Sequence, residues 1–208
     1  MTRHLPENER RGQILRAARS LFVEKGFLAT RMVDVAKRAE LSKGAVYFYF
    51  ESKRSLFDAL IEEEHATTLS FLEAAAVDPR PAAEKLVELG AQYLNYFAGL
   101  KSPPRFFLLM SEMAIRDELT RERAVEIHNH FVDLLTTLIG QGIQDGAFRP
   151  QDPRAAALML KAFVDGMAGQ SAIGIRPDVK RLSTDGIRII LEGLGSVELP
   201  SENTGTEG

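Results

Sequence analysis

The sequence predicts an all-α protein with a three-helix head and a six-helix body. Apolar residues recur at helical spacing along most of the 208 residues, and no segment shows the alternation typical of a strand. The charge is divided as well: residues 1–55 hold 12 Lys and Arg against 6 Asp and Glu, whereas residues 56–208 hold 14 against 23. A basic segment joined to an acidic one predicts that one end alone contacts a polyanion.

The first predicted helix spans residues 8–25. Gly26 is expected to end it in a left-handed conformation, and Phe27 is expected to fold back onto Phe22. The inward face of this amphipathic helix is formed by Ile14, Leu15, Ala18, Leu21 and Phe22. The helix should therefore support the two that follow it.

Residues 30–53, TRMVDVAKRAELSKGAVYFYFESK, predict two short helices joined by a tight turn. In the first, Met32, Val33 and Ala36 have the spacing to pack on a core, and Thr30 is placed to cap the free amides. Small Ala39 in the turn lets the two helices approach closely.

The second of these helices, residues 42–49, has one inward and one outward face. Ser42 caps it, and Val46 and Phe50 lie one turn apart on the inward side. Helix-turn-helix proteins place such a second helix in the major groove of DNA, with its N-terminal residues on base edges. For Phe48 and Tyr49 two assignments stay open: one of them contacts a thymine methyl or a sugar, and the other packs on the head.

This segment resembles the DNA-binding domain of the TetR family of bacterial transcriptional repressors, over residues 9–60. The matching positions are Thr30, Val35, Ala36, Ala39, Leu41, Ser42, Lys43, Gly44, Tyr47, Phe50, Lys53 and Leu56. The resemblance implies that Tyr47 touches the DNA backbone, that the body holds a ligand cavity, and that the last two helices pair with those of a second copy in a four-helix bundle.

The expected DNA contacts divide into base contacts and phosphate contacts. Lys43 is the candidate for base recognition because lysine can donate to guanine acceptors, with Ser42 and Ala45 adding hydroxyl and methyl contacts. Lys53 lies in the first turn of a helix, where a phosphate is favoured; the alternative is a plain surface lysine. The complete predicted DNA-binding set is Thr30, Arg31, Ser42, Lys43, Gly44, Ala45, Tyr47, Phe48 and Lys53.

Further helices are predicted at residues 52–76, 81–100, 106–115, 120–145, 153–173 and 178–194. Val125 is expected to face inward in the fourth of these. We expect a DNA-binding domain at residues 1–52, a regulatory domain at 53–194 and a disordered tail at 195–208.

Two sets of residues in the body are functional candidates. The ligand set joins aromatic and Met side chains, which suit an apolar or aromatic effector, although core packing is the ordinary role of such residues. Its members are Phe71, Tyr93, Tyr96, Phe97, Phe106, Met110, Met113, His128 and Phe131. The predicted dimer set, for which a monomer core is the alternative, is Ala156, Phe163, Met167, Ile187, Ile190, Leu191 and Leu194.

Several other classes of protein are disfavoured. The sequence has no cysteine, no run of about 18 apolar residues and no N-terminal apolar signal, so we expect a cytoplasmic protein without disulfides or a membrane span. No nucleophile elbow or glycine-rich phosphate loop is present, so we expect no enzyme activity and no cofactor. His128 and His130 point apart on a helix, so we expect no metal site.

We therefore expect a homodimeric, ligand-responsive repressor that binds a palindromic operator and is released by a small effector. The helix that begins at Ser52 is expected to carry the change from the body to the head. The alternatives are an activator of the same TetR type and a helical binding module that does not bind DNA.

Overall fold

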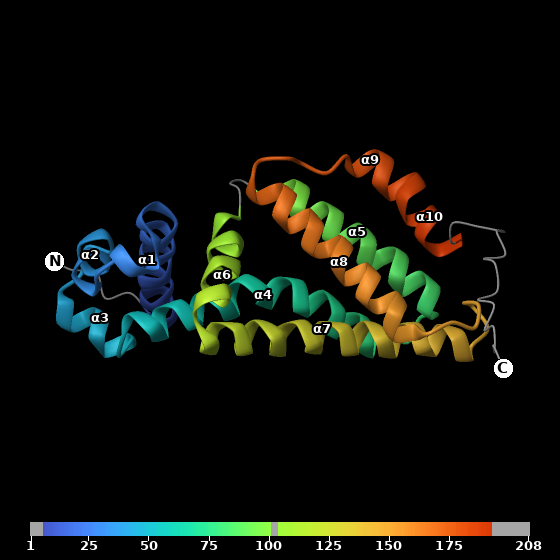
Figure 1. Ribbon diagram of the computed structural model, residues 1–208, viewed down its shortest axis with the longest axis horizontal. Helices are drawn as coiled ribbons and strands as arrows, with labels where there is room; N and C mark the ends of the chain where they lie inside the picture. The colour runs from blue at the N-terminus through green and yellow to red at the C-terminus, as the bar shows by residue number, and fades with distance from the viewer. Residues whose placement is uncertain (1–5, 101–103, 193–208) are drawn as a thin grey trace, which may run out of the picture.

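The computed structural model describes residues 6–100 and 104–192, and over these ranges every regular element is helical, which confirms the all-α prediction (Figure 1). The elements are α1 (Glu7–Ala29), α2 (Met32–Arg38), α3 (Lys43–Tyr49), α4 (Lys53–Val77), α5 (Ala82–Gly99), α6 (Arg105–Arg116), α7 (Glu118–Gln144), α8 (Pro153–Ala172), α9 (Val179–Arg181), the π-helical turn η1 (Leu182–Gly186) and α10 (Ile187–Glu192). The helices α1–α3 form a head at one end of an elongated molecule, and α4 leads from it into the body.

A kink near the end of α1 shapes the head. Gly26 has the positive φ that the sequence predicted, 82°, but its ψ of 164° is extended rather than left-handed helical, and the chain then makes a further turn to Ala29. The rings of Phe22 and Phe27 lie 5.5 Å apart between centroids, which confirms the predicted contact. A third ring, that of Phe57 on α4, lies 5.0 Å from Phe27 and joins the cluster.

Two predictions for the first short helix are wrong. Thr30 does not cap α2, because its hydroxyl donates to the carbonyls of Gly26 (2.8 Å) and Leu21 (3.3 Å), whereas Arg31 occupies the cap position. Val33 is 52% exposed rather than packed on the core. The buried stripe follows the helical repeat through Met32, Val35, Ala36 and Ala39, and Val33 lies outside it.

The helix α4 is shared by two hydrophobic clusters. The first contains the inward residues of α1–α3 together with Leu56, Phe57, Leu60 and Ile61 of α4, and it extends to α6 and α7. The second lies in the body and includes Leu72 near the other end of α4. The core of the head therefore continues past residue 52 along the first half of α4.

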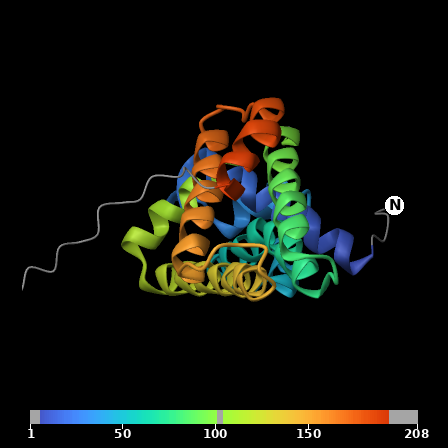
Figure 2. The ribbon, with the colours of Figure 1, turned by 90° about the vertical axis from the view of Figure 1, so that its right-hand side faces the viewer.

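The body is built around α4 and α7, as Figure 2 shows from the body end. The helices α5 and α8 rise from this base as two sides, and α9–α10 lie across the top. The predicted single helix at 178–194 is interrupted by η1. Val125 is 50% exposed, so its predicted inward position is wrong. Leu194 and the predicted tail fall outside the described residues.

Two arginines hold α4 against its neighbours. The Arg19 guanidinium of α1 pairs with Glu64 and with Glu63 (3.1 Å) on α4, and it lies 5.1 Å from the ring centroid of Phe106 on α6. Burial opposes the charged form of Arg19, but its hydrogen bonds to the glutamates outweigh this and raise its pKa. These contacts bring three helices to one point.

The second link is made by Arg54 in the first turn of α4. Its guanidinium pairs with Asp58 (2.8 Å) and with Asp117, the residue between α6 and α7. Asp117 also caps α7, because its carboxylate accepts from the Thr120 amide (2.8 Å) and hydroxyl (2.5 Å). Hydrogen bonds from Thr120 and then from Arg54 lower the pKa of Asp117 to about 2.

We predict that Asp117 stabilises the fold in a pH-dependent manner. An aspartate has a pKa of about 3.9 in an unfolded chain. Because folding lowers this pKa, the contribution is complete above about pH 4 and is lost as the pH falls toward about 2. The difference in unfolding temperature between wild type and Asp117→Asn, measured from pH 7 to pH 2, should shrink over that interval. A difference that is independent of pH would contradict this assignment.

A close approach at Gly142 predicts a second effect on stability. A Cβ atom at this position would lie 2.2 Å from two ring carbons of Phe148, whose amide donates to the Gly142 carbonyl (3.0 Å). Gly142→Ala should therefore lower the free energy of unfolding by about 1–3 kcal/mol.

Gly140 provides the matched control, because it lies in the same helix and has nothing within 4 Å of an added Cβ. Gly140→Ala should raise the free energy of unfolding by up to about 1 kcal/mol, through helix propensity. Urea unfolding of both variants gives the two free energies of unfolding for comparison with that of the wild type. Equal effects from the two would show that the Phe148 contact is unimportant.

Candidate functional site

The helix α3 presents a polar and aromatic surface to solvent at the end of the head. Its buried side is formed by Val46 and Phe50, which are 0% and 4% exposed. On the opposite side Lys43 and Gly44 are exposed, and Tyr47 and Phe48 are 41% and 80% exposed. An 80% exposed phenylalanine gains nothing from the fold, so this surface is suited to contact another molecule.

The outward side chains of α3 contact one another. The Lys43 ammonium lies 5.6 Å from the ring centroid of Tyr47. The rings of Phe48 and Tyr49 meet edge to face at 5.2 Å, and Tyr49 packs against the head cluster. Of the two assignments that the sequence left open, the structure therefore turns Phe48 outward and Tyr49 toward the head.

Backbone contacts fix how α3 lies on the rest of the head. Ser42 caps the helix by accepting from the Ala45 amide (3.1 Å), as the sequence predicted. In the preceding turn Glu40 has φ 54°, and the Leu41 amide donates to the Ala36 carbonyl (2.9 Å). The Gln13 side chain of α1 donates to the Ala39 carbonyl (2.7 Å), so the turn is held from both sides.

Three of the residues that were predicted to contact phosphates have different surroundings in the structure. Arg31 is exposed beside the start of α2, where it is available to a ligand. Thr30 is 1% exposed and its hydroxyl is bonded within the head, so it offers no free hydroxyl at the surface. The Lys53 ammonium donates to the carbonyls of Phe27 (2.7 Å) and Leu28 (3.1 Å), and burial lowers its pKa. In this structure Lys53 therefore caps the end of α1 and is not a plain surface lysine.

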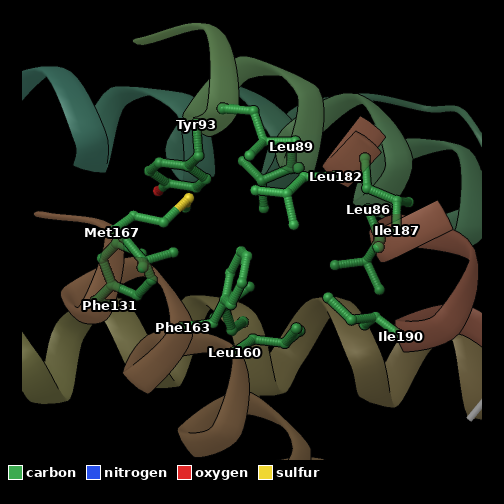
Figure 3. Close-up of a pocket in the computed structure, with 15 residues that line it drawn as sticks. Leu86, Leu89, Tyr93, Phe131, Leu160, Phe163, Met167, Leu182, Ile187 and Ile190 are labelled. Carbon is green, nitrogen blue, oxygen red and sulfur yellow. The ribbon is translucent and has the colours of Figure 1, made fainter. Parts of the chain in front are cut away.

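The body contains an apolar cavity of about 70 Å³ between α5, α7, α8 and the η1–α10 segment (Figure 3). The labelled side chains in Figure 3 point toward a common space. The lining residues are Leu86, Leu89, Gly90, Tyr93, Leu94, Phe131, Leu135, Leu160, Phe163, Val164, Met167, Leu182, Gly186, Ile187 and Ile190. The hydroxyl of Tyr93 is already bonded to the Thr68 carbonyl (2.6 Å), so the wall offers a ligand apolar contacts.

The structure divides the predicted ligand residues among different places. Tyr93 and Phe131 line the cavity. Phe106 and Met110 are buried in the cluster shared with the head, and Met113 packs against that cluster. The remaining members, Phe71, Tyr96, Phe97 and His128, lie in the body but not in the cavity wall. Aromatic character alone did not separate wall from core.

The predicted dimer residues overlap with this cavity. Phe163, Met167, Ile187 and Ile190 all line it. Ala156 is half-buried against the body core, and Leu191 belongs to α10. Four other cavity residues, Leu86, Leu89, Leu160 and Leu182, have apolar character at helical spacing, a signal that marks a core face without revealing a space beside it.

An apolar strip on the outer side of α8 has no partner within the part of the chain that the structure describes. Leu158 is 43% exposed, Met159 is 75% exposed and Phe163 is 40% exposed. Ile189 and Ile190 of α10 are 48% and 44% exposed. Together these residues form a surface that is suited to association.

Among residues 6–100 and 104–192, no three His, Asp or Glu side chains are grouped so as to hold a metal ion. No helix in these ranges is long and apolar enough to cross a membrane.

Comparisons with known proteins agree with this arrangement. Residues 14–60 match the profile of bacterial regulatory proteins of the tetR family, and residues 82–191 match that of the BetI-type transcriptional repressor C-terminal domain. The chain is 32% identical over 152 residues to the uncharacterized HTH-type transcriptional regulator YfiR of Bacillus subtilis strain 168, covering 72% of this chain and 73% of YfiR.

Two further proteins extend the comparison. The HTH-type transcriptional activator FasR of Mycolicibacterium smegmatis is 45% identical over 95 residues, which are 44% of this chain and 43% of FasR. A solved structure of SmeT in complex with triclosan superposes with a TM-score of 0.71 at 25% identity, covering 88% of this chain and 90% of SmeT.

Proposed function

Because the chain belongs to the tetR family of bacterial regulatory proteins, we propose that it is a ligand-responsive repressor that binds a palindromic operator as a homodimer. The observation that carries the proposal is the outward surface of α3, where Lys43, Tyr47 and Phe48 lie opposite the buried Val46 and Phe50. A major groove admits one such helix and covers its exposed aromatic side chains. The protein would act in the cytoplasm as a non-enzymatic DNA-binding regulator.

The proposed contacts follow from the exposure of the side chains. Lys43 lies at the first position of α3, from which it can reach guanine acceptors, and Gly44 leaves room for a close approach. Tyr47 and Arg31 are exposed, and we assign them to phosphate contacts. Phe48 supplies an apolar surface for a thymine methyl group or a sugar. For Lys53, a phosphate contact requires that its bonds to the α1 carbonyls be exchanged.

Dimerisation through the outer side of α8 and through α10 would place two such heads on one duplex. The apolar strip containing Leu158, Met159 and Phe163 supports this assignment, since a second copy would bury it. Dimers of helix-turn-helix proteins bind half-sites about one helical turn, or a multiple of it, apart.

A small apolar or aromatic effector is proposed for the cavity. The apolar wall supports this chemistry, and so does the structure of SmeT in complex with a small molecule, triclosan. A cavity of about 70 Å³ is smaller than the roughly 300–1,000 Å³ of ordinary ligand sites, so binding would require the α10 side to open. Ligand binding would then weaken operator binding, and operator binding would weaken ligand binding by the same factor.

The identity with FasR favours an activator as the second candidate function.

Lys43→Ala tests the head. Because Lys43 is assigned to a base edge, its loss should relax preference at one position of each half-site by about 1–3 kcal/mol. Arg31→Ala, which removes an assigned phosphate contact, should weaken all duplexes about equally and reduce the salt dependence. Selection from random duplexes, followed by affinity measurements at several salt concentrations, separates these results. Failure of the wild-type protein to bind any duplex at low salt would refute the proposed function.

Met159→Asp tests the dimer. A carboxylate in the middle of the α8 strip would be buried without a partner, so dimer affinity should fall at least about tenfold. Leu119→Asp is the matched control, because Leu119 is also largely exposed, at 62%, but lies at the start of α7. Sedimentation equilibrium should show a weaker dimer for the first variant alone. An unchanged Met159→Asp dimer would place the interface elsewhere.

A further inference from the structure

A groove of about 590 Å³ lies between the head and the body, separate from the cavity described above. It is bounded by α1 on the head side and by α6 and the end of α8 on the body side; Figure 1 shows α1 and α6 side by side. Its volume falls within the range of roughly 300–1,000 Å³ of small-molecule sites. Its lining residues are Phe22, Val23, Gly26, Arg105, Leu108, Leu109, Glu112, Ala172, Ile173 and Gly174.

The walls of this groove are mainly apolar and are exposed. Val23 is 36% exposed, Leu108 is 40% exposed and Ile173 is 68% exposed, and the three come from three different parts of the chain. A Cβ atom added at Gly26 or Gly174 would meet nothing within 4 Å, so space remains at both positions. An apolar group that enters the groove would be covered from both the head and the body.

The two charged residues of the groove are not equivalent. Glu112 is paired with Arg116 of the same helix at 3.4 Å. Arg105 is exposed, and its guanidinium makes no hydrogen bond or ion pair within residues 6–100 and 104–192. The groove therefore combines an apolar floor with one cation whose charge is not balanced by a neighbouring carboxylate. A guanidinium binds carboxylate, sulfonate and phosphate oxygens through paired N–H donors.

We propose that this groove binds a small amphipathic anion, whose apolar part lies on Val23, Leu108 and Ile173 and whose acidic group pairs with Arg105. The proposal does not rest on DNA binding, because it uses neither α3 nor the cavity under α10. The charge arrangement favours a small anion over a second copy of the chain, because the groove offers one cation that no neighbouring carboxylate balances.

A molecule bound in the groove would affect the position of the head through α1. Phe22 is fully buried beneath the groove and contacts Phe27 and Phe57 in the head cluster, at 5.5 and 5.7 Å between ring centroids. A molecule held between this cluster and α6 would fix the distance between head and body. The site is thus a second place at which a ligand can act on the orientation of the head.

The test uses two fluorescent probes of similar shape and different charge, in the absence of DNA. Anilinonaphthalene sulfonate carries an anion, whereas phenylnaphthylamine is neutral. Arg105→Gln should weaken binding of the sulfonate about fivefold and leave binding of the neutral probe unchanged. Leu108→Asp should weaken both probes, because it places a carboxylate on the apolar floor. Arg149→Gln, at another exposed arginine without an ion pair among the described residues, should change neither.

A filled-cavity variant, Leu86→Phe, distinguishes the groove from the cavity that Leu86 lines. In the Leu86→Phe background, Arg105→Gln should still weaken binding of the sulfonate about fivefold. Loss of sulfonate binding in Leu86→Phe, with normal binding in Arg105→Gln, would overturn the proposal. So would a change of oligomeric state in Leu108→Asp by sedimentation, since the groove would then be an interface between copies. Thermal unfolding of each variant confirms that it is folded.

Discussion

The structure depends on the continuity of α4, because this one helix belongs to two hydrophobic clusters. Leu56, Phe57 and Leu60 are buried with the head helices, and Leu72 is buried with the body. A helix of 25 residues is about 37 Å long and is held by hydrogen bonds along its whole length. A displacement of its body half is therefore carried to the segment that follows α3. Neither cluster can rearrange without the other being affected.

The polar contacts at the junction determine orientation more than stability. Arg19 and Arg54 are partly exposed, and such ion pairs contribute little net free energy. Each of them, however, joins elements that are distant in sequence: Arg19 joins α1 to α4 and α6, and Arg54 joins α4 to Asp117 at the α6–α7 corner. Because charged pairs are directional, they select one arrangement among several that would bury similar apolar area. The groove beside Arg105 lies next to this junction.

The cavity and the proposed dimer surface share residues on α8 and α10. Phe163 and Ile190 line the cavity and are also 40% and 44% exposed on the outside. Gly90 of α5 permits the close approach of Ile187, since an added Cβ would lie 3.2 Å from the end of that side chain and would require it to shift. A ligand that enlarges the cavity must therefore move side chains that a second copy would contact. In the proposed dimer, this sharing would couple the bound ligand to the dimer geometry, in addition to the path along α4.

Local pattern in the sequence determined the helices, the Ser42 cap, the positive φ of Gly26 and the inward Val46 and Phe50, because these depend on neighbours within one or two turns. The same pattern wrongly placed Val33 and Val125 inward, because the apolar character of a residue does not by itself show whether it lies on the buried or the exposed side of a helix. Only the tertiary structure decided that Tyr49 rather than Phe48 packs on the head, bonded Lys53 to the end of α1, and separated the cavity wall from the core around Phe106. Those outcomes depend on which helices meet, and contacts between distant segments leave no periodic signal in the chain.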